Sequence, residues 1–281
     1  MQIGLRLHDS KNIEIRERLD AVKQQGFSCV HLALSKIDGL VSGVDALSPG
    51  YAMYLRHLFD EAGLDIAVLG NYLNLAHPDK DTLKTIQHKY IAHLRFASHL
   101  GCSVVGTETG APNPTYSFDK ESCHSDWALD LFIENLKPVV EAAEKFGVIL
   151  AIEPVYKHIV YSSERARIVL DKIGSPNLQI IFDPVNLLHP DNLHRRDEII
   201  KEAIELLGPD ISIIHLKDYV LNDGNMDCLG CGFGQMDYER IVRFAVEKKP
   251  YIQATLENTT PDNAIKAREY IQSIERKILE A

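Results

Sequence analysis

The sequence has no excess of basic residues. Its 281 residues include 30 Lys and Arg against 40 Asp and Glu, which gives a formal net charge of −10. A protein with this charge has no general attraction for the phosphates of nucleic acids or for anionic membrane surfaces. We therefore expect neither nucleic acid nor a membrane as a partner.

Long hydrophobic runs are also missing. No apolar stretch approaches the roughly 18 residues of a membrane span. Residues 1–6 have neither the basic region nor the apolar core of a signal peptide. These absences predict a cytoplasmic protein. The five cysteines are an odd number, and a chain of this length does not need disulfide bonds for stability. Reduced thiols are therefore favoured over a disulfide framework.

No linker rich in Pro, Gly or Ser divides the chain. Short runs rich in β-branched residues alternate instead with longer segments of helical periodicity. The expected strands are residues 2–8, 29–34, 65–71, 104–110, 149–155, 178–183, 211–219 and 251–258. The expected helices are residues 13–25, a segment opening at 48–49, a long helix from 77–79 to 101, and residues 125–146, 163–173, 192–207, 237–248 and 261–279.

Eight strand–helix pairs in this length indicate an α/β fold, a single (β/α)8 TIM barrel that spans residues 1–281 and typically needs ~250 residues. An open, doubly wound sheet is the alternative. Against it, the first strand is followed by His8-Asp9-Ser10-Lys11 rather than a glycine-rich dinucleotide fingerprint. The longest irregular stretches, residues 111–122 and 222–236, both follow strands, where a barrel builds its active site.

Four apolar runs each end in one metal-ligand type. Glu153, Asp183, His215 and Glu257 stand late in or directly after the last four strands, about one strand–helix repeat apart. Because side chains alternate along a strand, all four can point into one barrel mouth. Three carboxylates and one imidazole predict a single divalent metal ion, Mn²⁺ first, with Mg²⁺, Co²⁺ and Zn²⁺ also compatible.

The motifs IEPV, FDPVN, HLKD and LEN carry these four residues, and together they resemble the xylose isomerase-like TIM barrel family of sugar phosphate isomerases and epimerases. The resemblance lies in the C-terminal half, since the N-terminal half agrees only in strand–helix rhythm. It implies that all four residues bind one metal. It also implies that Glu153 and Glu257 move the proton, next to a metal-bound carbonyl and through an enediolate, in a sugar, sugar-phosphate or keto-polyol substrate.

The chain departs from the ketose 3-epimerase branch of that family. Where the branch has a glutamate, a histidine and an arginine that contact substrate, this chain has Ile159, Asn186 and Leu221. A lyase or dehydratase that acts on a keto-sugar, keto-inositol or oxidised glycoside with the same metal site is therefore an alternative.

Two remote alternatives have other chemistry. An endonuclease IV-like hydrolase needs a multi-metal cluster with more histidines, but Asn186 occupies one of those positions and residues 222–236 contain no histidine. A non-catalytic sugar-binding barrel, or one subunit of a heteromeric enzyme, would keep the fold without the reaction. The presence of all four ligands argues against it.

Further polar residues at strand ends are candidate contacts for a small carbohydrate substrate: Arg6, His8, Asn71, Glu108, Asn186 and Lys217. Asp218 points to the opposite strand face from His215 and Lys217 and is expected to be structural. His31 is expected to be a barrel histidine whose hydrogen bonds are satisfied.

The lone Cys228-x-x-Cys231 pair is weak evidence for a metal or redox centre. Barrels of this kind frequently form dimers or tetramers, and the helices do not indicate which.

Overall fold

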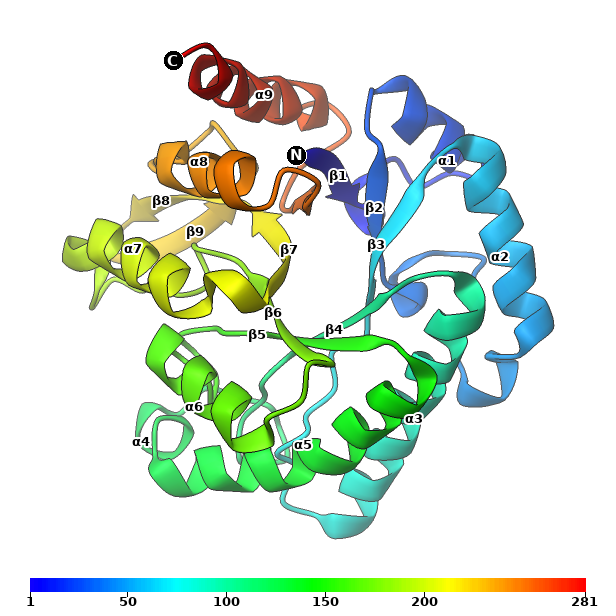
Figure 1. The fold of residues 1–281 in the computed structure, drawn as a ribbon, viewed down its shortest axis with the longest axis vertical. Coiled ribbons are helices and arrows are strands. Elements are labelled where there is room, and N and C mark those ends of the chain that lie inside the picture. The colour runs from blue at the N-terminus through cyan, green and yellow to red at the C-terminus, as the bar shows by residue number, and fades with distance from the viewer.

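A computed structural model describes all 281 residues and shows a closed barrel of eight parallel strands ringed by helices (Figure 1). The strands follow one another around the barrel in the order β1-β10-β7-β6-β5-β4-β3-β2. They are β1 (Gln2–Arg6), β2 (Cys29–Leu32), β3 (Asp65–Gly70), β4 (Val104–Glu108), β5 (Ile149–Glu153), β6 (Leu178–Phe182), β7 (Ile211–Leu216) and β10 (Gln253–Leu256). The predicted (β/α)8 TIM barrel is confirmed.

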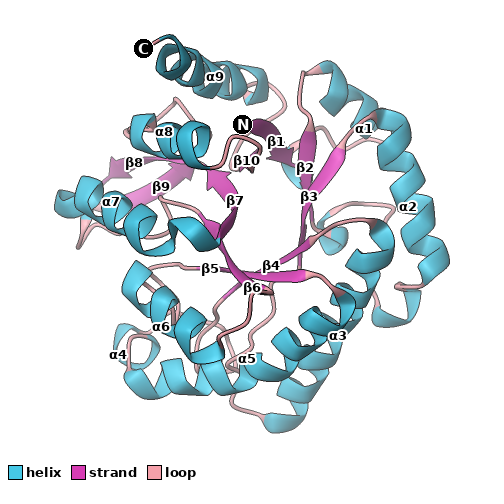
Figure 2. Cartoon of the chain, in the orientation of Figure 1, coloured by secondary structure: helices cyan, strands magenta, loops and turns pink.

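The helices form the outer layer (Figure 2). They are α1 (Ile15–Gln24), α2 (Pro49–Ala62), α3 (Lys80–Leu100), α4 (Lys120–Cys123), α5 (Asp126–Phe146), α6 (Ser163–Ile173), α7 (Arg196–Leu207), α8 (Glu239–Lys248) and α9 (Ala264–Glu280). The short α4 overlaps only the end of the stretch predicted to be irregular, residues 111–122. None of these helices combines the length and the apolar character that crossing a bilayer requires.

Local sequence signals set the helix ends. The Ser48 side chain accepts a hydrogen bond from the backbone N–H of Tyr51 at the start of α2, with Pro49 at the first helical position. Asp79 caps α3 in the same way through Thr82. Gly101 ends α3 with φ of 82°, a left-handed conformation that glycine adopts without steric cost.

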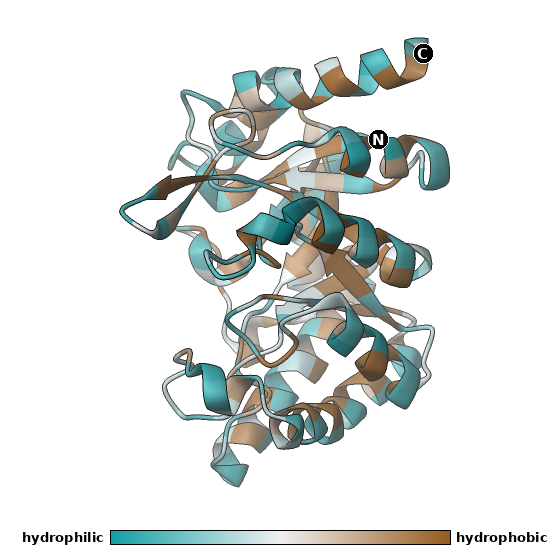
Figure 3. Ribbon diagram, turned by 90° about the vertical axis from the view of Figure 1, so that its left-hand side faces the viewer, coloured by the Kyte–Doolittle hydropathy of each residue, from teal (hydrophilic) through white to brown (hydrophobic).

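The barrel interior is filled by a small apolar cluster, separate from the larger core between strands and helices. Its members are Cys29, Ala67, Val68, Val104, Ala151, Ile181 and Ile213. Gly106 leaves room for them, because a Cβ there would lie 2.7 Å from Cδ1 of Ile181. In Figure 3 the central strands are largely white to brown, while the surrounding helices alternate between teal and brown. The packed interior leaves the C-terminal mouth of the barrel for a polar site.

One sequence expectation is wrong between β7 and α8. β7 ends at Leu216 rather than Tyr219, and much of the stretch predicted to be irregular is an antiparallel hairpin of β8 (Asp218–Asn222) and β9 (Asn225–Leu229). Its turn is Asp223-Gly224, with φ of 48° and 79°. This dipeptide is a strong hairpin signal, because both central residues of the turn need positive φ.

Asp218 anchors the segment that follows the hairpin. Its carboxylate accepts hydrogen bonds from the backbone N–H groups of Gly232 and Gly234, at 3.0 Å each, and of Met236, at 2.8 Å. The amides of this glycine-rich segment are therefore occupied by the protein's own carboxylate and are not a phosphate cradle. The predicted structural role of Asp218 follows from these contacts.

Candidate active site

The four predicted metal ligands lie at the C-terminal ends of neighbouring barrel strands. Glu153 is the last residue of β5, Asp183 directly follows β6, His215 is the fifth residue of β7, and Glu257 directly follows β10. None is more than 5% exposed. Since buried charged groups persist only when they are paired or bind a cation, the three carboxylates of this cluster require neighbouring positive charge.

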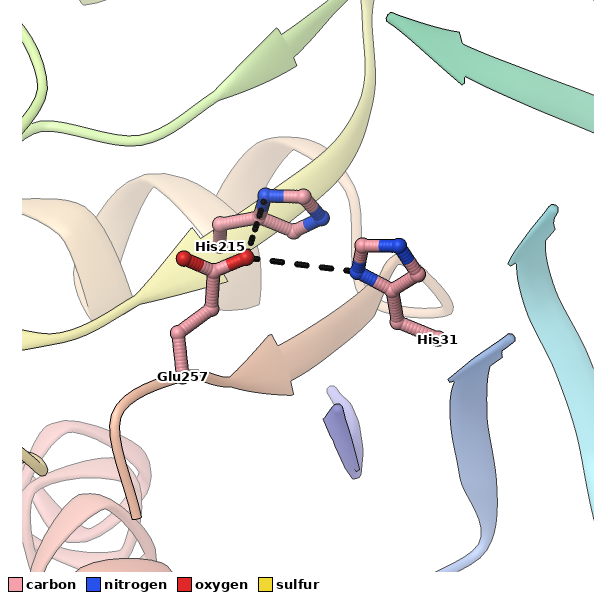
Figure 4. A group of neighbouring side chains, drawn as sticks. All are labelled: His31, His215 and Glu257. Atoms are coloured by element: carbon pink, nitrogen blue, oxygen red, sulfur yellow. Dashed lines mark ion pairs between the residues drawn. The ribbon is translucent and has the colours of Figure 1, made fainter. Parts of the chain in front are cut away.

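His215 joins two groups of potential ligand atoms. Its Nδ1 lies 3.3 Å from Oε1 of Glu153 and 3.2 Å from Oε1 of Glu257. One ligand atom each from Glu153, Asp183 and His215 fall within 4.8 Å of one another, and the same holds for His31, His215 and Glu257. Figure 4 shows the second group, with Glu257 facing both rings. The four predicted residues therefore meet around one imidazole.

The turn after β6 positions Asp183. Its Oδ1 accepts hydrogen bonds from the backbone N–H groups of Val185, at 2.9 Å, and Asn186, at 3.2 Å. Its Oδ2 accepts no hydrogen bond, although Nζ of Lys217 lies 3.0 Å away. One carboxylate oxygen thus holds the turn, and the other faces the cluster.

Lys217 is the buried cation of the cluster. Its Nζ lies between Asp183 and Oε2 of Glu257, at 3.2 Å from the latter, and its backbone carbonyl accepts a hydrogen bond from Tyr238. Burial opposes its charge, but the neighbouring carboxylates outweigh it and raise the pKa of the ammonium. Lys217 therefore stays protonated and offsets part of the negative charge.

Burial and the neighbouring charges shift the pKa values of three other groups in the cluster. Burial raises the pKa of Asp183 to about 6. Burial disfavours a charged His215, yet Glu153 and Glu257 raise the pKa of its imidazole to about 9. Burial would raise the pKa of Glu257 as well, but Lys217 and His215 outweigh it and lower that pKa. The cluster thus attracts positive charge strongly.

Replacing Lys217 with Met should destabilise the chelator-treated protein by about 3–5 kcal/mol, because the change leaves buried carboxylates without their cation. Thermal denaturation would measure the loss. Lys172→Met is the matched control, since it removes an exposed ion pair with Asp130 of 2.7 Å, a kind of pair worth at most ~1 kcal/mol. Equal losses in the two variants would contradict the assigned role of Lys217.

A pocket of about 360 Å³ opens above the cluster, lined by Arg6, His8, His31, Ala33, Lys36, Tyr72, Glu108, Glu153, Asn186, Lys217 and Glu257. Five of the six predicted substrate contacts line it. Asn71 does not. It directly follows β3, its backbone carbonyl accepts a hydrogen bond from Tyr90, and its buried side-chain nitrogen has no hydrogen-bond partner.

Several lining residues hold the two glutamates. Nδ2 of Asn186 donates to Oε1 of Glu153 at 2.7 Å. Arg6 pairs with Asp9 at 2.9 Å and reaches Oε2 of Glu257 at 3.4 Å. The two glutamates therefore have different neighbours, an amide for Glu153 and cations for Glu257.

Glu108, at the end of β4, lies across the barrel from Glu257 and next to Glu153 in the strand register. It accepts a hydrogen bond from the Tyr116 hydroxyl at 3.2 Å, and Nδ1 of His158 lies 3.8 Å from the same oxygen. Burial and the neighbouring Glu153 raise the pKa of Glu108 to about 7. This side of the pocket offers hydroxyl and carboxyl groups suited to binding substrate hydroxyls.

Sequence reasoning missed the part played by His31. Its Nε2 is 3.1 Å from the Tyr72 hydroxyl, but its Nδ1 has no hydrogen-bond partner and lies 3.9 Å from Oε1 of Glu257. Its ring also stacks on His215, with the centroids 5.2 Å apart. The expectation of a fully satisfied histidine is wrong. The available signal was its position near the end of the second strand.

The donor set fits a divalent cation. Two of its buried atoms, Nε2 of His215 and Oδ2 of Asp183, have no hydrogen-bond partner. Carboxylate oxygens with one imidazole are ligands that Mn²⁺, Mg²⁺ and Zn²⁺ accept. Glu153, Asp183, His215 and Glu257 are therefore the residues that would hold the ion, with His31 beside them.

A known protein is related to this chain by sequence. A 2-epi-5-epi-valiolone 7-phosphate 2-epimerase from Actinoplanes sp. (strain ATCC 31044 / CBS 674.73 / SE50/110) is 29% identical over 201 residues, 68% of this chain and 64% of that protein. The alignment thus spans less than two thirds of the relative's length.

Two solved structures share the whole fold. A D-tagatose 3-epimerase-like protein superposes with a TM-score of 0.76 at 20% identity, covering 100% of this chain and 99% of the other. A xylose isomerase-like protein from Mycobacterium smegmatis, in complex with magnesium, gives 0.72 at 17% identity, with 99% and 97% covered. A family model for the xylose isomerase-like TIM barrel matches residues 19–276, most of the chain, and the protein therefore belongs to that family.

Proposed function

We propose that this protein is a divalent-metal-dependent isomerase or epimerase of a sugar, sugar phosphate or keto-polyol. The observation that carries the proposal is the meeting of Glu153 and Glu257 at one imidazole nitrogen, each with an oxygen within 3.3 Å of Nδ1 of His215. Two carboxylates that face one small site can serve as base and acid for the same carbon.

A bound divalent ion would supply Lewis acidity, which makes a proton next to a substrate carbonyl easier to remove. Asp183 and His215 serve as ligands. Asp183 is fixed by two backbone amides, and His215 is fully buried, so neither needs to move during the reaction. A rigid set of ligands fixes the substrate relative to both glutamates.

Glu153 and Glu257 remove and return the proton. They come from opposite sides of β7, because β10 is its neighbour on one side and β6, followed by β5, on the other. Glu257, close to Lys217 and Arg6, has a lowered pKa and is ionised, as a base must be. Glu153 is held by the amide of Asn186, which leaves its second oxygen for the substrate.

One relative supports an epimerase, although a solved structure of the same fold is that of a probable 3-DHS dehydratase. The relative found by sequence is named as a 2-epimerase of a phosphorylated valiolone. A lyase that begins with the same proton abstraction is the alternative, and its products distinguish it. We further propose Mn²⁺ as the native ion and a homo-oligomer as the assembled form.

Proton exchange tests the proposal directly. The Mn²⁺-loaded protein is incubated in D₂O with a panel of ketoses, keto-inositols and their phosphates, and the products are followed by NMR. We expect deuterium at a carbon next to the carbonyl, together with conversion to an isomer or epimer. Release of a second product would identify a lyase, and metal-loaded protein that exchanges no substrate proton would indicate a binding protein.

A further inference from the structure

The wall of the pocket formed by β1, β2 and the turns after them is basic because it carries Arg6 and Lys36, whereas His8 on the same wall is neutral, since burial and Arg6 lower the pKa of its imidazole to about 4. Arg6 is the last residue of β1, His8 lies in the turn that follows, and Lys36 lies in the turn after β2. All three line the pocket above the cluster. Glu153, at the end of β5, lies across the barrel from β1, whereas Glu108, at the end of β4, is separated from β2 by β3 alone.

The charges of the pocket do not cancel on this basic wall. Three carboxylates, Glu153, Asp183 and Glu257, balance a divalent ion together with Lys217. Arg6 is matched by Asp9, through hydrogen bonds of 2.9 and 3.1 Å. Lys36 forms no ion pair, unlike the two other cations of the pocket.

His8 adds an unused hydrogen-bonding atom. Its Nδ1 is buried and has no hydrogen-bond partner. Its ring lies edge-on to His31, with the centroids 6.0 Å apart, so it belongs to the same pocket wall. A buried polar atom without a partner costs free energy unless a ligand or water satisfies it.

We propose that Lys36, His8 and Arg6 form a subsite for an anionic substituent of the substrate, a phosphate or a carboxylate remote from the reacting carbon. This rests on the proposed function and adds a substrate class to it. Lys36 supplies the free charge, His8 the unpaired nitrogen, and the Arg6 guanidinium further N–H donors beside Asp9.

The β4 side of the pocket fixes the orientation. The Glu108 carboxyl disfavours an anion, whereas it and the Tyr116 hydroxyl can bind substrate hydroxyl groups. A substrate therefore enters with its anionic end toward β1 and β2 and its hydroxyl-bearing end toward β4. The carbonyl region then lies over His215, between the two glutamates.

Anion binding to Lys36→Met tests the subsite. Isothermal titration of the Mn²⁺-loaded wild type and variant with inorganic phosphate, and separately with acetate, measures affinity and shows which anion is preferred. We expect Lys36→Met to weaken binding of the preferred anion by about 10-fold to 100-fold, the range for losing a charge-assisted hydrogen bond. Lys36→Arg should retain binding within about threefold.

Lys266→Met, at an exposed lysine of α9, is the matched control and should bind the anion as wild type does. The ratio of kcat/KM for a phosphorylated ketose to that for the same free ketose should fall at least about tenfold in Lys36→Met. Unchanged affinity for both anions in that variant would overturn the subsite. Should no ketose exchange its protons with the wild type, the proposed function fails, while the titrations still decide the subsite.

Discussion

Asp183→Asn is expected to reduce affinity for Mn²⁺ by more than about 100-fold, and kcat/KM by about 10³-fold, or about 4 kcal/mol. Residues that merely support metal ligands already contribute up to about 100-fold. Asp183 is nearly fully buried, and one of its carboxylate oxygens lies within 4.8 Å of ligand atoms of Glu153 and His215. An amide keeps the shape but replaces one oxygen with a donor that faces Lys217.

Titration calorimetry with Mn²⁺ measures the affinity, and proton exchange in D₂O measures the activity. Asp262→Asn, at an exposed position before α9, is the matched control and should change neither. Circular dichroism checks that the barrel remains folded, which is expected because the amide oxygen of Asn can still accept a hydrogen bond from the backbone N–H of Val185. Wild-type affinity and activity in Asp183→Asn would exclude the metal site.

Glu153→Gln and Glu257→Gln should each slow interconversion by about 10²–10⁴-fold, the usual contribution of a positioned acid or base. A mechanism with two bases also predicts that proton exchange and interconversion become separated in each variant. Each variant should still exchange the proton of the one isomer whose C–H faces the remaining carboxylate, but it should not convert that isomer to the other.

Deuterium incorporation into each isomer, followed separately by NMR, measures this asymmetry. Gln preserves the hydrogen bond that Glu153 accepts from Asn186, so the shape of the pocket is maintained. Glu239→Gln, on the exposed face of α8, is the control. If one variant lost exchange with both isomers and the other lost nothing, a single-base mechanism would replace the proposed one.

The barrel and its four metal-ligand candidates could be predicted because both follow from periodic signals. Apolar runs, capping residues and glycines at helix ends are local, and parallel strands bring their C-terminal ends to one edge. The spacing of Glu153, Asp183, His215 and Glu257 thus placed them at one mouth without knowledge of any contact.

The remaining features depend on tertiary contacts. His31 and Tyr72 belong to the pocket through the packing of β2 against β3, which no local pattern encodes. Tyr116 reaches Glu108 from a loop, with φ of 56°. The hairpin of β8 and β9, in contrast, has a local signal, because the Asp223-Gly224 dipeptide favours a tight turn. The neighbouring glycines and cysteines are more typical of an irregular loop.

The substitutions that separate this chain from the ketose 3-epimerase branch have distinct structural settings. Ile159 is fully buried, whereas Leu221 lies on β8 and is 46% exposed. Neither lines the pocket above the metal ligands, whereas Asn186 does. The substrate contacts that Ile159 and Leu221 do not make must therefore come from residues that line the pocket, which fits the proposed use of the β1 and β2 wall.

The region between β7 and α8 is held together by Asp218 independently of the barrel sheet. One carboxylate ties residues 232–236 back to the start of the hairpin, while the barrel strands pair without it. The hairpin tip can therefore change in length or sequence while the strand bearing His215 stays in place. Exchange of the hairpin tip between relatives is therefore expected to alter which substrates reach the C-terminal end of the barrel, while the proposed metal ligands and acid–base residues are retained.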